Sequence, residues 1–308
     1  MDIEDSFQTH RPRLFALAYR LLGSRADAED VVQDAWLRWH QADRAAIRDP
    51  EAWLVTAATR LGIDRLRAVR ARRERYPGPW LPEPVRIEQD EAANAAPDDG
   101  RADPGADPVG AAERAEQVSL AFLAVLERLG PEERAAFLLR EVFDYEHARI
   151  AELLGRSEAA CRQMVHRARE RVAAARPRFE VAPHRHRRLL ERFMDAASRG
   201  DRGALEALLR EDARLVSDGG GKAVAAIRPL QGGERIARLF WAAYRRADPA
   251  IVWRIGRVNG EPAVLRYRGD VLAAVMVVVG DGERIAAIYT VANPDKLAVT
   301  PPHAGASW

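Results

Sequence analysis

The chain contains 308 residues, of which 47% are hydrophobic, and its formal net charge is +2. This length and composition suit two or three globular domains, each with its own core. Cys161 is the single cysteine, which excludes an intrachain disulfide and fits a reducing compartment. No signal-peptide pattern opens the chain, and the longest apolar run, residues 271–279, is far shorter than the ~20 residues of a membrane-spanning helix. We therefore expect a soluble cytoplasmic protein without a membrane contact.

The first predicted module covers residues 1–76 and is helical. Apolar residues recur at helical spacing from Phe7 to Leu22, and a second helix is predicted over residues 28–40. Asp49 and Pro50 then provide the N-cap and the first-turn proline of a third helix. Seven arginines lie between residues 60 and 75. Such a cluster favours DNA as a partner of this helix.

A flexible acidic and proline-rich linker is predicted over residues 77–110. Seven acidic residues lie between residues 88 and 107, and large apolar side chains are few after Pro84. Such a segment cannot bury enough surface to offset its ordering entropy, so most of it should be mobile. Its first part reads WLPEP and consists of Trp80, Leu81, Pro82, Glu83 and Pro84. A large aromatic anchor on an extended proline-containing segment could dock in an apolar groove, although an ordinary proline-rich linker has a similar composition.

A second helical module is predicted over residues 111–176, and its last part reads as a helix-turn-helix. An apolar-faced helix ends near Gly155, and Ser157 is a suitable N-cap for the next helix. In that helix Cys161, Val165, Ala168 and Val172 should face the core, which makes Cys161 a packing residue. The outward side is polar and basic, as expected of a major-groove reader. Arg162 and Gln163 suit base edges, whereas Arg156 and Arg167 suit phosphates. An ordinary helix pair with a solvated arginine face is the alternative.

The third predicted module covers residues 184–300, followed by a short tail, residues 301–308. Two helices (187–198 and 202–210) should precede two short strands (213–217 and 222–228), a helix (233–246) and four more strands (251–257, 263–268, 271–279 and 284–291). Helices followed by an antiparallel meander predict an α+β fold whose curved sheet wraps around the helices.

The helix over residues 28–39 presents an unusual outward face. Its outward stripe consists of Asp30, Gln33, Asp34 and Leu37, and phosphates would repel such a surface. We interpret this face as a protein-docking surface and the arginine-rich helix that follows as a DNA-binding surface. The first module therefore has the properties of a factor that brings an enzyme to DNA.

The segments AEDVVQDAWLRW (28–39) and DPEAWLVTAATRLGIDRLRAVRARRE (49–74) resemble region 2 of a bacterial sigma factor of the extracytoplasmic-function (ECF) group. The segment from Leu126 to Val172 resembles region 4 of the same group, in the expected order and spacing. The resemblance implies a multidomain protein with two all-α sigma domains, which directs transcription initiation and is not itself an enzyme. Its implied partners are promoter DNA and core RNA polymerase, through the β′ clamp helices and the β flap.

The resemblance also assigns roles to individual residues. It implies that Asp30, Gln33, Asp34 and Trp36 bind the β′ clamp helices. The loop 41–48 and the helix 56–67 would melt and read the minus-ten element, with Arg60, Asp64, Arg65 and Arg67 as the contacts. The minus-thirty-five element would be read in the major groove by Arg156, Ser157, Glu158, Arg162, Gln163 and Arg167.

The order of elements in the third module resembles the SnoaL-like, NTF2-like cone fold. Three short motifs are typical of ECF sigma factors with a fused SnoaL-like extension: WLPEP, DGGGK (Asp218, Gly219, Gly220, Gly221 and Lys222) and NPDKL (Asn293, Pro294, Asp295, Lys296 and Leu297). The resemblance implies that the extension regulates the sigma core in cis through these segments. The three glycines also permit close approach of another segment, although a flexible hairpin tip would share them. The chain's two lysines lie in these motifs, and chance is the alternative explanation.

Two other functions remain open from the residues alone. A DNA-tethered SnoaL-like enzyme of the cyclase or isomerase type is disfavoured, because no histidine or cysteine lies between residues 187 and 302. A repressor without polymerase contacts would tolerate charge reversal at Asp30 and Asp34. We find no spacing of metal ligands and predict no cofactor. The cone pocket could hold a small ligand that the sequence does not identify.

Overall fold

A computed structural model describes residues 3–43, 46–89, 119–175, 181–246 and 248–298. Most of the predicted linker, from residue 90 onward, and the tail at 301–308 lie outside the described residues. The chain divides into two compact units. One contains the described chain up to Arg75 together with Leu123 to Ala175; the other contains the segment that begins at Tyr76 and the chain from Val181 onward.

Three helices form the first part of unit 1: α1 (Ile3–Leu22), α2 (Arg25–Gln41) and α3 (Pro50–Arg73). The predicted cap is present, since Oδ1 of Asp49 accepts a hydrogen bond from the Ala52 backbone N–H at 2.9 Å. Leu14, Leu54 and Leu66 are fully buried, so the apolar stripes of the three helices share one core.

Four further helices follow: α5 (Leu120–Leu126), α6 (Pro131–Glu141), α7 (His147–Leu154) and α8 (Glu158–Ala175). Gly155 ends α7 with φ of 63°, a left-handed conformation that glycine adopts without strain. Within unit 1, α6 packs against α1, α3 and α8. It therefore lies between the first three helices and the helix-turn-helix formed by α7 and α8.

Unit 2 contains a seven-stranded mixed sheet: β1 (Ile87–Gln89), β2 (Leu209–Asp218), β3 (Leu230–Gln231), β4 (Ile251–Val258), β5 (Glu261–Arg268), β6 (Val271–Gly280) and β7 (Ile285–Val291). The strand order is β1-β4-β5-β6-β7-β2-β3, and the pairing of β2 with β7 is parallel. The predicted antiparallel meander is confirmed in β4 to β7.

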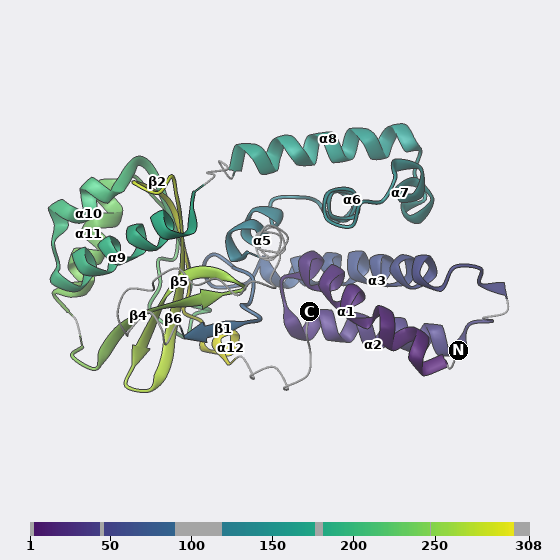
Figure 1. Ribbon diagram of the computed structural model, residues 1–308, viewed down its shortest axis with the longest axis horizontal. Helices are drawn as coiled ribbons and strands as arrows, with labels where there is room; N and C mark the ends of the chain where they lie inside the picture. Colours follow the sequence, from purple (N-terminus) through teal and green to yellow (C-terminus); the bar gives the residue numbers. More distant parts are fainter. Residues whose placement is uncertain (1–2, 44–45, 90–118, 176–180, 247, 299–308) are drawn as a thin grey trace. The chain divides into compact units, whose positions relative to one another are not determined.

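Helices α9 (Pro183–Arg199), α10 (Arg202–Leu208) and α11 (Gly233–Tyr244) pack together with one face of this sheet (Figure 1). Their core includes Phe193, Val264 and Ile288, all fully buried. The short helix α12 (Pro294–Leu297) follows β7 and contacts β6. The result is the α+β fold expected from the sequence.

Two elements of unit 2 differ from the sequence-based expectation. The predicted strand over residues 222–228 is wrong, because that stretch forms turns and bends and only Leu230–Gln231 pairs with β2. The Gly219 carbonyl accepts hydrogen bonds from the backbone N–H groups of Lys222 and Ala223, so a turn occupies the start of that stretch. Conversely, β1 was not predicted: it lies in the linker, and Ile87 pairs with Val258 on β4. A strand of three residues leaves too short a pattern for sequence periodicity to detect.

Candidate nucleic-acid interface and linker docking site

The helix-turn-helix presents the predicted polar face. Arg156, Ser157, Glu158, Arg162, Gln163 and Arg167 are all exposed, while Cys161, Val165 and Ala168 are buried on the opposite side of α8. Ser157 caps α8, since its hydroxyl accepts from the Ala160 backbone N–H at 3.2 Å. Arg162 forms an ion pair with Glu158 along the helix. Burial raises the pKa of the Cys161 thiol, as expected for a packing residue.

On α2 the predicted docking face is also exposed. Asp30, Gln33 and Asp34 face solvent, and the Leu37 side chain is 42% exposed. Trp36 is half-buried, and its ring stacks on His40 with centroids 5.4 Å apart. The stripe therefore combines acidic groups with accessible apolar surface, a composition suited to a protein partner.

The arginines of α3 that were assigned to the minus-ten element already have partners within unit 1. Arg65 donates to Asp27 at 2.8 Å and to Asp30 at 2.5 Å, and the hydrogen bond to Asp27 raises its pKa. Arg60 donates to the carbonyl oxygen of Leu153 at 3.2 Å. Arg67 pairs with Asp64 at 2.9 Å and with Glu132 at 2.7 Å. Residues 44 and 45 of the predicted reading loop lie outside the described residues.

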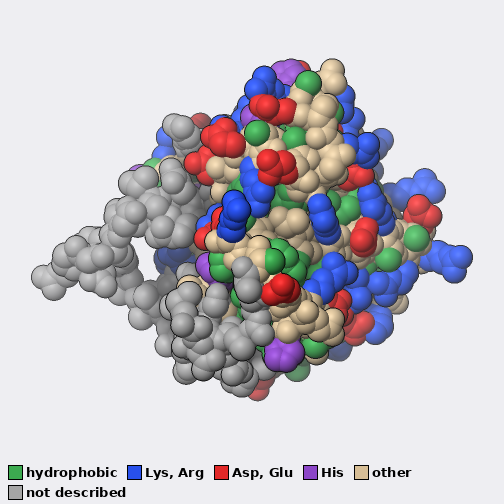
Figure 2. All heavy atoms as spheres, turned by 90° about the vertical axis from the view of Figure 1, so that its right-hand side faces the viewer, with side chains coloured by type: hydrophobic (Ala, Val, Ile, Leu, Met, Phe, Trp, Pro, Cys, Tyr) green, Lys and Arg blue, Asp and Glu red, His purple; other side chains and the backbone are tan. Residues whose placement is uncertain are grey.

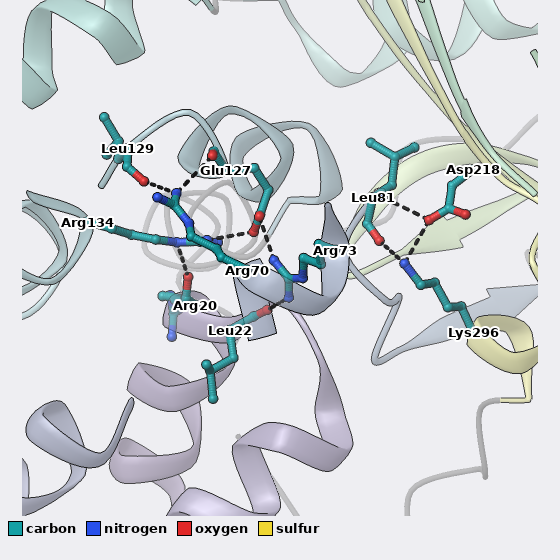
Figure 3. Close-up of polar contacts among 10 residues, drawn as sticks. All are labelled: Arg20, Leu22, Arg70, Arg73, Leu81, Glu127, Leu129, Arg134, Asp218 and Lys296. Carbon is teal, nitrogen blue, oxygen red and sulfur yellow. Dashed lines mark hydrogen bonds and ion pairs between the residues drawn. The ribbon is translucent and has the colours of Figure 1, made fainter. Parts of the chain in front are cut away.

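A largely buried ionic cluster joins α3 to α6 in unit 1, and it was not predicted (Figure 3). The Glu127 carboxylate accepts from Arg73 and from Arg134, each at 2.6 Å. Arg73 also donates to the Leu22 carbonyl at 2.5 Å, and Nε of Arg134 donates to the Arg20 carbonyl at 3.1 Å. Burial alone raises the pKa of Glu127, but the charges and hydrogen bonds of Arg134 and Arg73 lower it overall.

In unit 2 the three sequence motifs meet at one residue of the linker (Figure 3). The Leu81 backbone N–H donates to Oδ2 of Asp218 at 2.8 Å, and the Leu81 carbonyl accepts from the Lys296 ammonium at 2.5 Å. Asp218 and Lys296 are themselves an ion pair at 2.7 Å, with side chains 0% and 6% exposed. One buried pair thus satisfies both backbone groups of Leu81.

Aromatic side chains complete this linker docking site, which we define by Trp80, Leu81, Asp218, Asn293 and Lys296. The Lys296 ammonium lies 3.9 Å from the centroid of the Trp80 ring. Tyr76, which the sequence did not single out, donates its hydroxyl to Asp218 at 2.6 Å and accepts from the Asn293 amide at 2.8 Å. Burial and the Asp218 hydrogen bond raise the pKa of Tyr76.

The remaining linker residues lie close to these contacts. Leu81, Pro82 and Pro84 are buried, and Glu83 is half-buried. Oδ1 of Asn259 accepts from the backbone N–H groups of Val85 at 2.9 Å and Arg86 at 3.2 Å. Asn259 has a positive φ of 53°, which asparagine tolerates better than most residues.

The glycines of DGGGK are required by close packing. A Cβ at Gly219 would lie 2.4 Å from the Ala223 carbonyl oxygen, and one at Gly220 would lie 2.3 Å from the Asn293 amide nitrogen. At Gly221 a Cβ would approach Pro77 of the linker to 2.8 Å. Lys222 instead lies at the surface and pairs with Asp295 at 2.5 Å, while Leu297 is buried and Pro294 is exposed.

No helix in the described part of the chain is long and apolar enough to cross a membrane. Among the same described residues, no group of three or more histidine, cysteine, aspartate or glutamate side chains is arranged to hold a metal ion.

Comparison with protein families agrees with this architecture. Residues 7–73 match sigma-70 region 2, residues 119–172 match sigma-70 region 4, and residues 190–300 match the SnoaL-like domain. The combination of two helical sigma modules and an α+β domain defines a bacterial sigma factor with a fused SnoaL-like domain.

Comparison with individual proteins gives the family. The chain is 38% identical over 306 residues to the ECF RNA polymerase sigma factor SigJ of Mycobacterium tuberculosis, covering 96% of this chain and 93% of that protein. It is 32% identical to the probable ECF RNA polymerase sigma factor SigI of the same species, covering 96% and 94%. The crystal structure of M. tuberculosis SigJ superposes with a TM-score of 0.71 at 34% identity, covering 98% of this chain and all of that one. The chain belongs to the ECF sigma factors, which bind core RNA polymerase and promoter DNA to initiate transcription.

Proposed function

We propose that the SnoaL-like domain of this sigma factor controls the sigma core in cis through the linker docking site. The observation that carries this proposal is the fixation of the Leu81 backbone by the buried Asp218–Lys296 pair. The docked segment begins directly after α3, the arginine-rich helix of region 2. Docking and release of this segment therefore change how much freedom the chain between regions 2 and 4 has.

Truncation at α12 tests this proposal. A chain that ends at Ala292 loses Asn293 and Lys296, whereas a chain that ends at Ala298 keeps both and lacks only residues beyond the described part. We expect run-off transcription with core polymerase to change for the shorter chain and to stay near wild type for the longer one. Hydrogen exchange at the Leu81 amide should rise only in the shorter chain. Equal transcription by both truncated chains would contradict the proposal.

For the polymerase, we propose that the exposed face of α2 binds the β′ clamp helices, with Asp30, Gln33, Asp34 and Trp36 as contacts. Region 4 binds the β flap. The exposure of three polar residues beside the accessible Leu37 and Trp36 supports this assignment. Arg65, which the resemblance assigns to the minus-ten element, then has a second role. Its ion pair with Asp30 positions that carboxylate for the polymerase.

For the promoter, we propose that Arg60, Asp64, Arg65 and Arg67 contact the minus-ten element. The exposed face of α8 reads the minus-thirty-five element. Arg162 and Gln163 contact base edges there, Arg156 and Arg167 bind phosphates, and Ser157 and Glu158 orient the first turn of the helix. All six residues are exposed, and all but Arg167 lie at or just before the N-terminal end of α8, which supports this assignment.

We expect Arg162→Ala to relax base preference at one position of the minus-thirty-five element and to weaken binding of the preferred base by about tenfold. Arg167→Ala should weaken binding evenly across sequences and reduce its salt dependence. Both effects can be measured by selecting holoenzyme-bound DNA from a library randomised over the minus-thirty-five element. The matched control is Arg149→Ala on α7, a half-buried arginine that pairs with Glu152. An unchanged base preference in Arg162→Ala would remove this residue from the reading face.

We also propose a signal for the cis control. It is a small ligand that binds between the sheet and the helices of the SnoaL-like domain. Partly buried apolar side chains such as Phe240 and Trp253 pack against the core of this domain and would suit contact with an apolar ligand.

A further inference from the structure

One carboxylate in unit 1 holds an arginine from each of the two proposed DNA-reading surfaces. Oε1 of Glu132, in the first turn of α6, accepts from Arg67 of α3 at 2.7 Å. Its other oxygen, Oε2, accepts from Arg156, in the turn before α8, at 2.9 Å. Arg67 belongs to the proposed minus-ten contacts and Arg156 to the proposed minus-thirty-five contacts.

A carboxylate that binds two guanidinium groups, one at each oxygen, offers them the same chemistry as a DNA phosphate. While Glu132 holds Arg67 and Arg156, these side chains cannot make the same hydrogen bonds to a phosphate. A third proposed contact is occupied as well, because Arg60 donates to the Leu153 carbonyl of α7. Figure 2 shows the wider pattern: basic and acidic side chains lie intermixed over the described part of the visible face, without a continuous basic field.

The Glu132 contacts are half-exposed and are individually weak, since exposed ion pairs contribute about 1 kcal/mol or less. The largely buried cluster around Glu127 joins the same modules, with the side chains of Arg134, Arg73 and Glu127 0%, 11% and 19% exposed (Figure 3). Arg134 of α6 is fully buried and reaches the α1 carbonyl of Arg20, while Arg73 of α3 reaches Glu127. If one member of such a cluster is lost, the remaining charges stay in the interior without compensation. The two modules therefore separate only when all members become solvated together.

Aromatic contacts join the same modules on another side. The Arg13 and Arg20 guanidinium groups each lie 5.7 Å from the centroid of the Phe143 ring, which follows α6. Burial lowers the pKa of Arg20 to about 10. The packing of region 2 on region 4 therefore includes charged groups that water would stabilise if the modules separated.

We propose that Glu132 is an internal phosphate mimic and Glu127 a buried latch, which together keep the free sigma core in a closed state that excludes DNA. The proposal rests on the DNA contacts proposed above for Arg67 and Arg156. Promoter DNA competes with Glu132 for these two arginines, and the modules separate when the Glu127 cluster opens. The device lies in unit 1 and is distinct from the linker docking site of unit 2.

Phosphate contacts do not depend on sequence, so a duplex of random sequence can test the mimic with the full-length chain. We expect Glu132→Gln to bind a 30-base-pair random duplex about threefold more tightly than wild type at low salt. Glu141→Gln is the matched control. It removes the same charge from the same helix, but the partner of Glu141 within the described residues is Arg169, outside the proposed DNA contacts. Its affinity should stay at the wild-type value. The gain from Glu132→Gln should disappear when Arg67 and Arg156 are both replaced by alanine.

The outcomes separate the two proposals. If the Arg67→Ala and Arg156→Ala variants weaken duplex binding but Glu132→Gln behaves like Glu141→Gln, the mimic is refuted and the DNA contacts stand. If the two arginine variants bind the duplex like wild type, the proposed DNA contacts fail and the mimic fails with them.

The latch is tested by energy transfer between dyes on Ala26→Cys of α2 and Ala173→Cys of α8, with Cys161 replaced by serine. Both alanines are exposed. We expect lower transfer in Glu127→Gln than in the parent, and a similar decrease when the parent binds the duplex. In unlabelled Glu127→Gln, continued protection of the buried Cys161 thiol from alkylation shows that region 4 is still folded. Unchanged transfer in folded Glu127→Gln would overturn the latch.

Discussion

Replacing Lys296 by methionine is expected to destabilise unit 2 by about 3 kcal/mol, because it leaves the buried Asp218 carboxylate without its cation. Methionine keeps the length of the side chain, so the lost interactions are chiefly the ion pair, the hydrogen bond to Leu81 and the charge over the Trp80 ring. Chemical denaturation measures the change in the free energy of unfolding. Hydrogen exchange at the Leu81 amide reports whether the linker is released.

The chain provides its own control for this experiment. Lys222 is its other lysine and also forms an ion pair in unit 2, with Asp295, but both side chains are more than half exposed. Because exposed pairs contribute little, Lys222→Met should change the free energy of unfolding by about 0.5 kcal/mol or less. Similar small effects in both variants would show that burial of the Asp218–Lys296 pair does not determine linker docking. A transcription change in Lys296→Met alone would link docking to cis control.

Reversing the charge of Asp34 is expected to weaken binding to core RNA polymerase by about a hundredfold, because an arginine would meet a surface that is complementary to a carboxylate. Asp34 is chosen over Asp30 because Asp30 also pairs with Arg65, and its replacement would disturb the packing of α2 on α3. The affinity for core polymerase can be measured by fluorescence anisotropy of the labelled full-length chain.

The control for Asp34→Arg is Glu74→Arg, a charge reversal at an exposed acidic residue that follows α3. It should leave polymerase binding near the wild-type value. A repressor that acts without polymerase would tolerate both changes, as would a sigma factor that uses another face of α2. Wild-type affinity in Asp34→Arg would therefore rule out the proposed docking face.

Much of the architecture follows from local sequence. The Asp49 cap, the left-handed Gly155 and the buried side of α8 are set by neighbours three or four residues apart. The glycines of DGGGK likewise indicated a close approach, although the sequence did not show that Asn293 and Pro77 are the approaching residues. The strand predicted at residues 222–228 is wrong for a non-local reason. Its composition favours a strand, but within the described residues no neighbouring strand pairs with it.

The sequence by itself determined the two helical sigma modules, the α+β class of the third, and the residues that face solvent on α2 and α8. These properties depend on periodicity and capping, which act within a few residues. Only the tertiary structure decided that Leu81 meets Asp218, 137 residues later, and that Glu127 lies between Arg73 and Arg134. The first is a buried hydrogen bond between distant segments, and the second is a largely buried ion-pair cluster that brings α3 to Glu127 and α6. No local pattern encodes them, because the charges become partners only when the fold removes them from water.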